Sequence, residues 1–207
     1  MIDKKCKLCR REGTKLFLKG ERCNLTKCSF LKRKYPPGVH GPKGYPKTSE
    51  YGKQLREKQK VKRIYGFLER HLENYIKKAI QTIGNAEENL LKLFEQRLDN
   101  VVYRLGFGSS RSNARQVVGH GHIRIDGRKV DIPSFQVKVG QTITLKPNSK
   151  IIKKIKENFA ANKDKNKTPE WLSLDESNLS ARVLTTPRVD DLLKELNCKL
   201  IIEFYSR

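Results

Sequence analysis

Apolar residues recur at helical spacing through two stretches in the middle of the chain. The first stretch follows Thr48 and Ser49, either of which can cap a helix, and predicts one helix running to about Ile80. The second predicts a helix from Ala86 to Leu105. The supporting apolar positions are Leu55, Ile64, Leu68, Leu72, Tyr75, Ile76 and Ala79 in the first, and Leu90, Leu91, Phe94, Leu98, Val101 and Val102 in the second. We interpret both apolar stripes as core.

The pattern then changes from helical spacing to alternation. A short helix is predicted over residues 111–118, with Ser109 or Ser110 as its cap. Beyond Gly119, apolar and polar residues alternate, and Asp126-Gly127 is a hairpin-turn signal. The alternation predicts short strands at residues 122–126, 129–132, 135–139 and 142–145.

The last part of the chain predicts both helix and strand. Residues 149–167 carry one apolar face, which indicates a short helix followed by a Lys- and Asn-rich linker. Residues 190–196 predict a capped helix, and the apolar run at 200–205 predicts a final strand. Taken together, the patterns predict an α+β fold.

The first 47 residues have too few apolar side chains for a core, but they carry a cysteine pattern. Cys6, Cys9, Cys23 and Cys28 are spaced C-x2-C-x13-C-x4-C. Two close pairs separated by a loop can place four thiolates at the corners of a tetrahedron, as in a structural zinc site. Zinc (Zn2+) is the expected metal, and an iron–sulfur cluster on the same thiolates is the alternative. The remaining cysteine, Cys198, has apolar neighbours and is expected to be buried.

Charge narrows the class of partner. The 207 residues include 45 Lys and Arg against 22 Asp and Glu, a net charge of +23 with a pI of about 10.0. Such an excess fits a protein held against a polyanion, either nucleic acid or an anionic membrane surface. No apolar run approaches the roughly 20 residues that span a bilayer, and the N-terminus lacks the apolar core of a signal peptide. We therefore expect a cytosolic (cytoplasmic) protein with no membrane partner.

The short helix at 111–118 carries a candidate phosphate-binding face. Arg111, Arg115 and Gln116 share or border one exposed face, and the planar guanidinium of arginine suits phosphate oxygens. A merely solvated basic face is the alternative. His120 and His122 flank the following turn, where hydrogen bonds to backbone or RNA are favoured over a metal pair.

Catalytic patterns are missing from the sequence. It contains no glycine-rich phosphate loop, no Ser-His-Asp pattern and no paired acids in an apolar pocket. We therefore predict that the protein is not an enzyme and takes no small-molecule substrate.

Several segments resemble one protein family. An RNA-binding module named after bacterial ribosomal small-subunit protein S-four is similar to the stretch Arg97-Leu98-Asp99-Asn100-Val101-Val102-Tyr103-Arg104-Leu105-Gly106-Phe107, followed by Ala114-Arg115-Gln116, His120-Gly121-His122 and Gly127. The rest of the chain resembles the S-four ribosomal protein family itself, in Cys9-Arg10-Arg11-Glu12-Gly13, Tyr51-Gly52-Lys53-Gln54-Leu55-Arg56, Pro169-Glu170-Trp171-Leu172 and Glu203-Phe204-Tyr205-Ser206-Arg207. The resemblance covers nearly the whole chain.

The resemblance implies an organisation in three parts. Residues 1–47 are expected to form a four-cysteine metal knuckle and a basic Pro/Gly arm, as in the metal-binding branch of the family. Residues 48–96 plus 168–207 are expected to form a mainly helical domain. Residues 97–167 are expected to form an inserted small α/β RNA-binding module with its linker.

The resemblance also implies a function. Members of the family are structural constituents of the small ribosomal subunit, which bind 16S-type ribosomal RNA at a multi-helix junction of the 5′ domain and nucleate assembly of the subunit body. They lie beside ribosomal protein S-five, near the channel through which messenger RNA enters, and contribute to translational accuracy. Some bind the messenger RNA of their own operon. An organellar ribosome is the alternative location.

Charge and motif position give the candidate RNA-binding residues. From the N-terminal part and the first long helix they are Arg10, Arg11, Lys15, Lys19, Arg22, Tyr35, Lys43, Tyr51, Lys53, Arg56, Lys58 and Lys62. From the module they are Arg111, Arg115, Gln116, His120 and Arg124. Two rival functions use the same module: an RNA-modifying enzyme, and a stress factor that binds displaced ribosomal particles.

Overall fold

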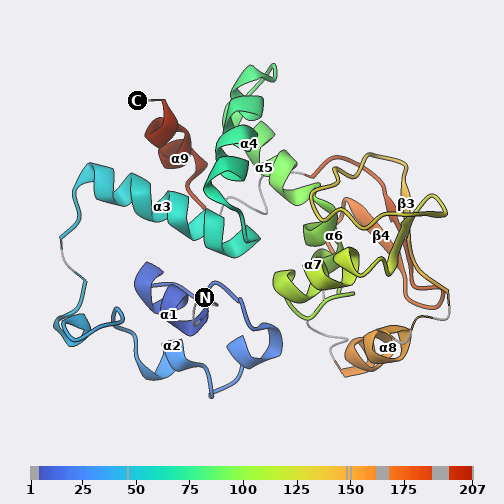
Figure 1. The fold of residues 1–207 in the computed structure, drawn as a ribbon, viewed down its shortest axis with the longest axis horizontal. Coiled ribbons are helices and arrows are strands. Elements are labelled where there is room, and N and C mark those ends of the chain that lie inside the picture. The colour runs from blue at the N-terminus through green and yellow to red at the C-terminus, as the bar shows by residue number, and fades with distance from the viewer. Residues whose placement is uncertain are drawn as a thin grey trace. The chain divides into compact units, whose positions relative to one another are not determined.

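The structure is a computed structural model that describes residues 5–45, 47–147, 149, 151–161, 168–187 and 196–206 (Figure 1). The chain forms two compact units. The first unit comprises residues 1–90 and 193–207, and the second comprises residues 91–192. Within the described ranges, no helix has the length and apolar character needed to cross a membrane.

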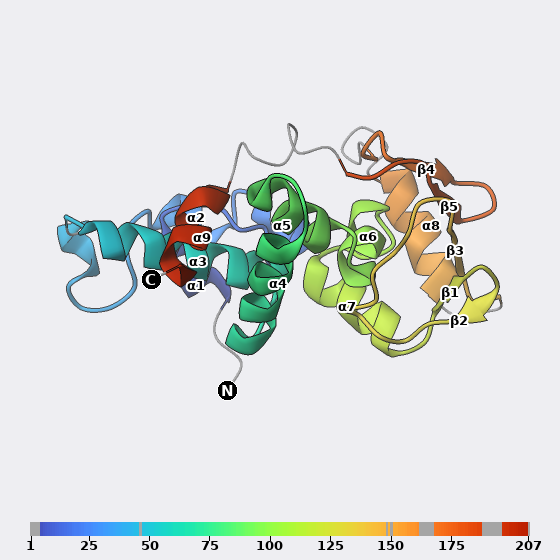
Figure 2. The ribbon, with the colours of Figure 1, turned by 90° about the horizontal axis from the view of Figure 1, so that it is seen from above.

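The first unit is helical in its described parts. Its longest helices are α3 (Glu50–Tyr65) and α4 (Glu69–Gln81). α9 (Cys198–Tyr205), from the other end of the sequence, packs against both of them, and Figures 1 and 2 show it lying beside α3. The N-terminal segment contributes α1 (Lys5–Glu12), a 3-10 turn at Gly20–Cys23, α2 (Ser29–Lys32) and a 3-10 turn at Gly41–Lys43.

The first predicted long helix is divided into α3 and α4. Gly66 ends α3 with a φ of 69°, in the left-handed region that glycine adopts without strain. Phe67, only 4% exposed, then packs with its ring 5.4 Å from the rings of both Tyr65 and Tyr75. The prediction of a single helix is wrong here, because apolar spacing continues across a turn that tertiary packing stabilises.

The second predicted long helix is also divided, into α5 (Ala86–Glu95) and α6 (Leu98–Arg104). Between them, Arg97 forms an isolated antiparallel bridge with Gln136. The N–H of Leu98 donates to the carbonyl of Phe135 at 2.8 Å. Residues 135–139 thus pair with the break between α5 and α6. The prediction of a strand there is wrong, because these residues do not join the sheet.

The second unit combines helices with an antiparallel sheet. Its further helices are α7 (Arg111–Gly119) and α8 (Ile151–Ala161), both close to the predicted positions. The sheet has the order β2-β1-β3-β5-β4, formed by β1 (Ile123–Ile125), β2 (Arg128–Lys129), β3 (Thr142–Leu145), β4 (Leu172–Asp175) and β5 (Ser180–Val183). The predicted α+β class is confirmed by this combination.

Local signals in the second unit are confirmed in detail. Ser110 caps α7, since its Oγ accepts the N–H of Asn113 at 3.3 Å. Asp126 and Gly127 join β1 to β2 with φ values of 48° and 80°, as a tight hairpin turn requires. The alternating residues of β1 place Ile123 and Ile125 in the core.

The structure differs from the expected domain division at residues 168–187. The resemblance places these residues in the helical domain, but β5 pairs with the outer edge of β3, with Ile143 opposite Ala181. β4 continues the sheet beyond β5, and Trp171 and Leu172 join the core of the second unit. Backbone hydrogen bonding along an open strand edge places this segment, and that pairing has no local sequence signal.

The C-terminal segment is a helix rather than the predicted strand. Asn197 caps α9, since its Oδ1 accepts the N–H of Leu200 at 3.3 Å. Ile201 and Cys198 are fully buried, which confirms the expected burial of this cysteine. The predicted helix at 190–196, except Leu196, and most of the Lys- and Asn-rich linker fall outside the described residues.

Candidate nucleic-acid interface

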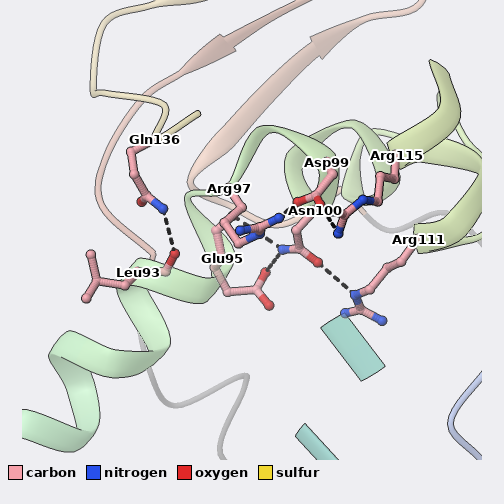
Figure 3. Close-up of polar contacts among 8 residues, drawn as sticks. All are labelled: Leu93, Glu95, Arg97, Asp99, Asn100, Arg111, Arg115 and Gln136. Carbon is pink, nitrogen blue, oxygen red and sulfur yellow. Dashed lines mark hydrogen bonds and ion pairs between the residues drawn. The ribbon is translucent and has the colours of Figure 1, made fainter. Parts of the chain in front are cut away.

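A buried polar network lies at the junction of α5 and α6 (Figure 3). Glu95 is fully buried, and its carboxylate accepts two hydrogen bonds from Arg104, at 3.0 and 3.1 Å. Arg97, 3% exposed, donates twice to the carboxylate of Asp99, at 3.0 and 2.7 Å. Such charge-assisted, two-point contacts fix both partners and offset the cost of burying their charges.

Asn100 connects this network to α7. Its side chain is 1% exposed, and its Nδ2 donates to a carboxylate oxygen of Glu95 at 2.8 Å. Its Oδ1 accepts a hydrogen bond from Nε of Arg111 at 2.8 Å. The guanidinium of Arg111 also lies 4.6 Å from the ring centre of Tyr103. Arg111 is therefore oriented by a buried amide on one side and an aromatic ring on the other.

Arg115 lies one helical turn beyond Arg111 and faces the same network. Its Nη1 lies 3.9 Å from Oδ2 of Asp99, the carboxylate that Arg97 also contacts. The network thus contains the carboxylates of Glu95 and Asp99 and the guanidinium groups of Arg97, Arg104, Arg111 and Arg115. Figure 3 draws these residues except Arg104. Positive charge is in excess, and the excess is carried on α7.

The other candidates in the module lie near this helix. Gln116 and His120 are exposed on α7 and directly after it, whereas Arg124 is partly exposed on β1. The imidazole of His120 lies 6.1 Å from that of His122, whose Nδ1 is 3.0 Å from the hydroxyl of Ser149. The structure therefore brings Arg111, Arg115 and Gln116 onto one helix, with His120 at its end.

In the first unit, the candidates on α3 divide into exposed and buried groups. Tyr51 and Lys53 are exposed, although Lys53 contacts Glu50 at 2.6 Å and the ring of Tyr51 lies 5.6 Å from that of Phe204. Arg56 is partly exposed and lies 3.3 Å from a carboxylate oxygen of Glu12, on α1. Arg56 thus links α3 to the N-terminal segment.

Lys58 is the candidate that the structure buries. Its residue is 7% exposed, its Nζ lies 4.4 Å from the ring centre of Phe204, and it donates to Glu69 at 2.6 Å. Lys62 and Tyr205 donate to the same carboxylate, at 2.9 and 2.5 Å. Lys58 and Lys62 thus take part in the contacts that fasten α9 and α4 to α3.

Partial burial alone would raise the pKa of Glu69. Hydrogen bonds from Lys58, Tyr205 and Lys62 outweigh that effect and lower its pKa to about 2. Burial, together with the hydrogen bond to Glu69, raises the pKa of the Tyr205 hydroxyl. The cluster is thus held together by an ionised carboxylate.

The N-terminal candidates are mostly exposed. Arg10 differs, since it donates to the carbonyls of Tyr35 and Pro36 at 2.9 and 3.0 Å and lies 4.8 Å from the ring centre of Tyr35. Arg10 and Tyr35 therefore fasten α1 to the Pro/Gly arm. The other candidates are exposed or partly exposed, namely Arg11, Lys15, Lys19, Arg22 and Lys43.

The four predicted metal ligands lie in this same segment. Cys9, Cys23 and Cys28 are buried and Cys6 is partly buried. Burial raises the pKa of the Cys9 thiol, a backbone hydrogen bond from Leu16 lowers it, and the charges of the other three thiols raise it further. The N–H of Lys19 lies 3.3 Å from Sγ of Cys23 and donates to it.

These observations fit a metal held by four thiolates. The thiols are near enough to influence one another, and backbone N–H groups point at two of the sulfurs. Among the described residues, however, no group of three or more His, Cys, Asp or Glu side chains is already arranged as a metal site. Binding would therefore need the thiols to lose their protons and draw together.

Sequence reasoning missed the acidic and amide partners of the basic residues. Glu12 is the clearest case, because its side chain is 1% exposed and forms ion pairs with both Arg56 and Arg63. Glu95, Asp99 and Asn100 play the same part in the module. The one sequence signal for them is the presence of isolated acidic residues in strongly basic or apolar stretches.

Comparison with known proteins covers the whole chain. Residues 1–95 match the family model described as Ribosomal protein S4/S9 N-terminal domain, and residues 96–143 match the S4 domain. The small ribosomal subunit protein uS4 of Geotalea daltonii is 51% identical to this chain, over 98% of this chain and 96% of its own length. The protein of the same name from Trichlorobacter lovleyi is 50% identical, over 100% of this chain and 98% of its own length.

Proposed function

This chain belongs to the family of small ribosomal subunit protein uS4, and on that premise we propose that it binds ribosomal RNA through a basic surface on each of its two units. It is a structural protein of the small ribosomal subunit rather than an enzyme. The observation that carries this conclusion is similarity at about half identity along almost the entire chain.

The surface proposed in the second unit is the outer face of α7. Arg111 and Arg115 supply guanidinium groups for phosphate oxygens, and Gln116 and His120 supply further hydrogen bonds. The orientation of Arg111 is set in advance by Asn100 and Tyr103, so less rotamer entropy is lost on binding. Arg124, on β1, extends this surface.

The surface proposed in the first unit combines the exposed candidates of α3 with those of the N-terminal segment. Tyr51, Lys53, Arg11 and Lys19 are accessible to RNA, and Arg56 is partly so. Lys58 is buried beneath this surface, and Glu69 matches its charge. It therefore supports the surface instead of contacting RNA. Recognition of a folded RNA by shape suits such a rigid set of cations, since the deep groove of A-form RNA hides base edges.

The proposed RNA is 16S-type ribosomal RNA, at a multi-helix junction of its 5′ domain. Binding there would nucleate assembly of the subunit body in the cytoplasm. The proposed protein neighbour is protein S-five, close to the channel through which messenger RNA enters and with an effect on translational accuracy. The messenger RNA of the chain's own operon is a further proposed ligand. Family membership and the net charge of +23 support these proposals.

Zinc is the metal proposed for Cys6, Cys9, Cys23 and Cys28, with an iron–sulfur cluster as the alternative. When bound, the metal would supply a fixed cross-link between α1 and the loop that carries the second cysteine pair. The support is the chemistry of the four thiols and the backbone donors to Cys9 and Cys23.

A salt-titrated binding assay tests the proposed function. The metal-loaded chain is titrated into a 5′-domain fragment of 16S RNA and into an unrelated structured RNA of equal length. We expect tight, selective binding to the ribosomal fragment that survives moderate salt. Equal and salt-labile binding to both RNAs would contradict the proposal.

A pair of variants matched in charge locates the surface in the second unit. Replacing Arg111 and Arg115 with Ala should weaken binding to the ribosomal fragment and reduce the salt slope by about 0.7–0.9 for each phosphate that is no longer neutralised. Replacing the exposed neighbours Lys77 and Lys78 of α4 with Ala removes the same charge and serves as the control. An equal loss of affinity for the ribosomal fragment in both double variants would show that net charge, and not this surface, accounts for the effect.

A further inference from the structure

The N-terminal segment of the first unit contains a cationic cavity of about 430 Å³. Ser29 of α2 and Cys6 of α1 are among the residues that line it. No carboxylate of the described residues lines it, and the charged residues of the wall are Lys7, Arg10, Lys19, Lys32 and Arg33. Sequence reasoning selected only Arg10 and Lys19 of these five.

The backbone of the segment brings the five cations to one place. Lys7 and Arg10 follow Cys6 and Cys9 on α1, and the N–H of Lys19 donates to Sγ of Cys23. The N–H of Lys32 donates to the carbonyl of Cys28 at 3.4 Å. The positions of the cations are therefore tied to the same turns that carry the four cysteines.

One cation of the wall is fixed in advance. Two nitrogens of the Arg10 guanidinium donate to the carbonyls of Tyr35 and Pro36, and the group is stacked near the ring of Tyr35. A guanidinium held in this way loses little entropy when it binds an anion. Lys7, Lys19, Lys32 and Arg33 are exposed, so their side chains can close on a ligand from the rim.

We propose that this cavity is a binding site for a phosphate-bearing ligand the size of a nucleotide. Five like charges around one cavity repel one another unless an anion lies between them, and phosphate oxygens accept several charge-assisted hydrogen bonds at once. The volume lies within the range of about 300–1,000 Å³ that holds small ligands. Two sources present this chemistry, a phosphodiester of the RNA backbone and a free oligophosphate. The first of these, binding of an RNA phosphodiester, deepens the proposed function and rests on it.

Two probes on the metal-loaded full chain distinguish the sources. One is tripolyphosphate, and the other is a short single-stranded RNA that carries phosphodiesters and no terminal phosphate, each titrated by calorimetry. The test variant is Lys32→Gln with Arg33→Gln, and the charge-matched control is Lys77→Gln with Lys78→Gln on α4. Both pairs are adjacent and exposed, so neither change disturbs a core.

We expect the test variant to bind at least one probe about tenfold or more weakly than the control, the effect of removing one charge-assisted hydrogen bond. Weaker binding of the RNA probe, with or without weaker binding of tripolyphosphate, would assign the cavity to a backbone phosphate of RNA. Weaker binding of tripolyphosphate alone would assign it to a free oligophosphate. Equal affinities of the two variants for both probes would overturn the inference. Unchanged circular dichroism spectra of the variants confirm that the comparison is between folded proteins.

The outcome is independent of the test of the proposed function. If the chain binds the 5′-domain fragment selectively, but its test and control variants bind both probes with equal affinity, the proposed function stands and the proposed cavity site is rejected. If the chain shows no selectivity for the fragment, but its test variant binds tripolyphosphate more weakly than the control, the proposed cavity site stands and the proposed function is rejected.

Discussion

Asn100 and Arg111 form a hydrogen bond of 2.8 Å between a buried side-chain oxygen and the Nε of a partly exposed arginine. The amide of Asn100 is oriented by hydrogen bonds from its Nδ2 to the carboxylate and to the backbone carbonyl of Glu95. A cation proposed to contact RNA is thus held by a residue that is itself only 1% exposed. Asn100 acts as a positioning residue for Arg111.

Replacing Asn100 with Ala tests this relationship. We expect the free energy of unfolding to fall by about 1–3 kcal/mol, because buried polar partners are left unsatisfied. Under conditions where the protein stays folded, RNA affinity should also fall. In an Arg111→Ala background the same change should leave RNA affinity unaltered, since Asn100 acts through Arg111. A double-mutant cycle of RNA binding measures this coupling.

Gln136 provides the control for the cycle. Its Nε2 donates to the carbonyl of Leu93 at 3.1 Å, so it is a side-chain amide of the same unit that bonds to backbone instead (Figure 3). Gln136→Ala should destabilise the unit without changing RNA affinity. Additive decreases in affinity for Asn100→Ala and Arg111→Ala would show that Asn100 does not act through Arg111.

Glu69 should make the first unit sensitive to acid. Its pKa is lowered to about 2 in the folded chain, from 4.5 for an ordinary glutamate. A carboxyl group with a lowered pKa stabilises the fold fully above its unfolded pKa, and that contribution disappears as the pH falls from about 4.5 towards 2. The difference in unfolding free energy between the wild type and Glu69→Gln should therefore be largest near neutral pH. Chemical denaturation at a series of pH values measures it.

Glu73 is the control for this prediction. It lies on the same helix, and its carboxylate forms an exposed ion pair with Lys77 at 2.7 Å. Exposed pairs of this kind contribute little, so Glu73→Gln should have a small effect at every pH. A stability difference for Glu69→Gln that stays constant between neutral pH and pH 2 would contradict the role of the ionised carboxylate.

Gly108 should tolerate no side chain. A Cβ at this position would lie 2.7 Å from the backbone N and Cα of Ala114, in α7. Gly108→Ala should therefore displace α7 and lower the free energy of unfolding by about 1–3 kcal/mol. Thermal unfolding measures this, with Gly119→Ala as the matched control.

Gly119 ends the same helix, and a Cβ there meets no atom of the described structure within 4 Å. Its substitution by Ala should be neutral or slightly stabilising, by about 0.4–1 kcal/mol. Equal stability of the two variants would show that α7 can move away from Gly108 at no cost.

Removing metal should expose the four N-terminal thiols and leave the fifth protected. Cys198 is fully buried, and burial, with the nearby charges of Glu87 and Glu57, raises its pKa to about 12. We expect a thiol reagent to modify the metal-loaded native chain slowly. After treatment with a strong chelator it should modify Cys6, Cys9, Cys23 and Cys28 rapidly and Cys198 only on unfolding. The same rapid reaction before and after chelation would contradict metal binding by these thiols.

Local signals were sufficient for parts of the second unit. A serine in front of a short periodic stretch predicts α7 and its cap, and Asp126-Gly127 predicts the hairpin of β1 and β2. Both depend on interactions within a few residues, so a pattern along the chain contains them. The break at Gly66 depends on the packing of Phe67, which spacing alone does not reveal.

The candidate interface was predictable in charge but not in geometry. Arg115 and Lys58 both appear in the sequence as basic residues on helices. The structure exposes Arg115 and buries Lys58 against Phe204 and Glu69, which come from other helices. A residue's charge is a local property, whereas its burial depends on which distant segments pack over it.

The sequence by itself determined the α+β class, the family resemblance, the polyanion partner and the cysteine pattern, because composition, motif spacing and caps are properties of neighbouring residues. Tertiary structure alone decided that residues 168–187 extend the sheet of the second unit, that the C-terminal apolar run is a helix on α3, and that Asn100 holds Arg111. Those outcomes require contacts between segments far apart in the chain. Their free energies come from burial and hydrogen bonding that exist only once both partners are in place.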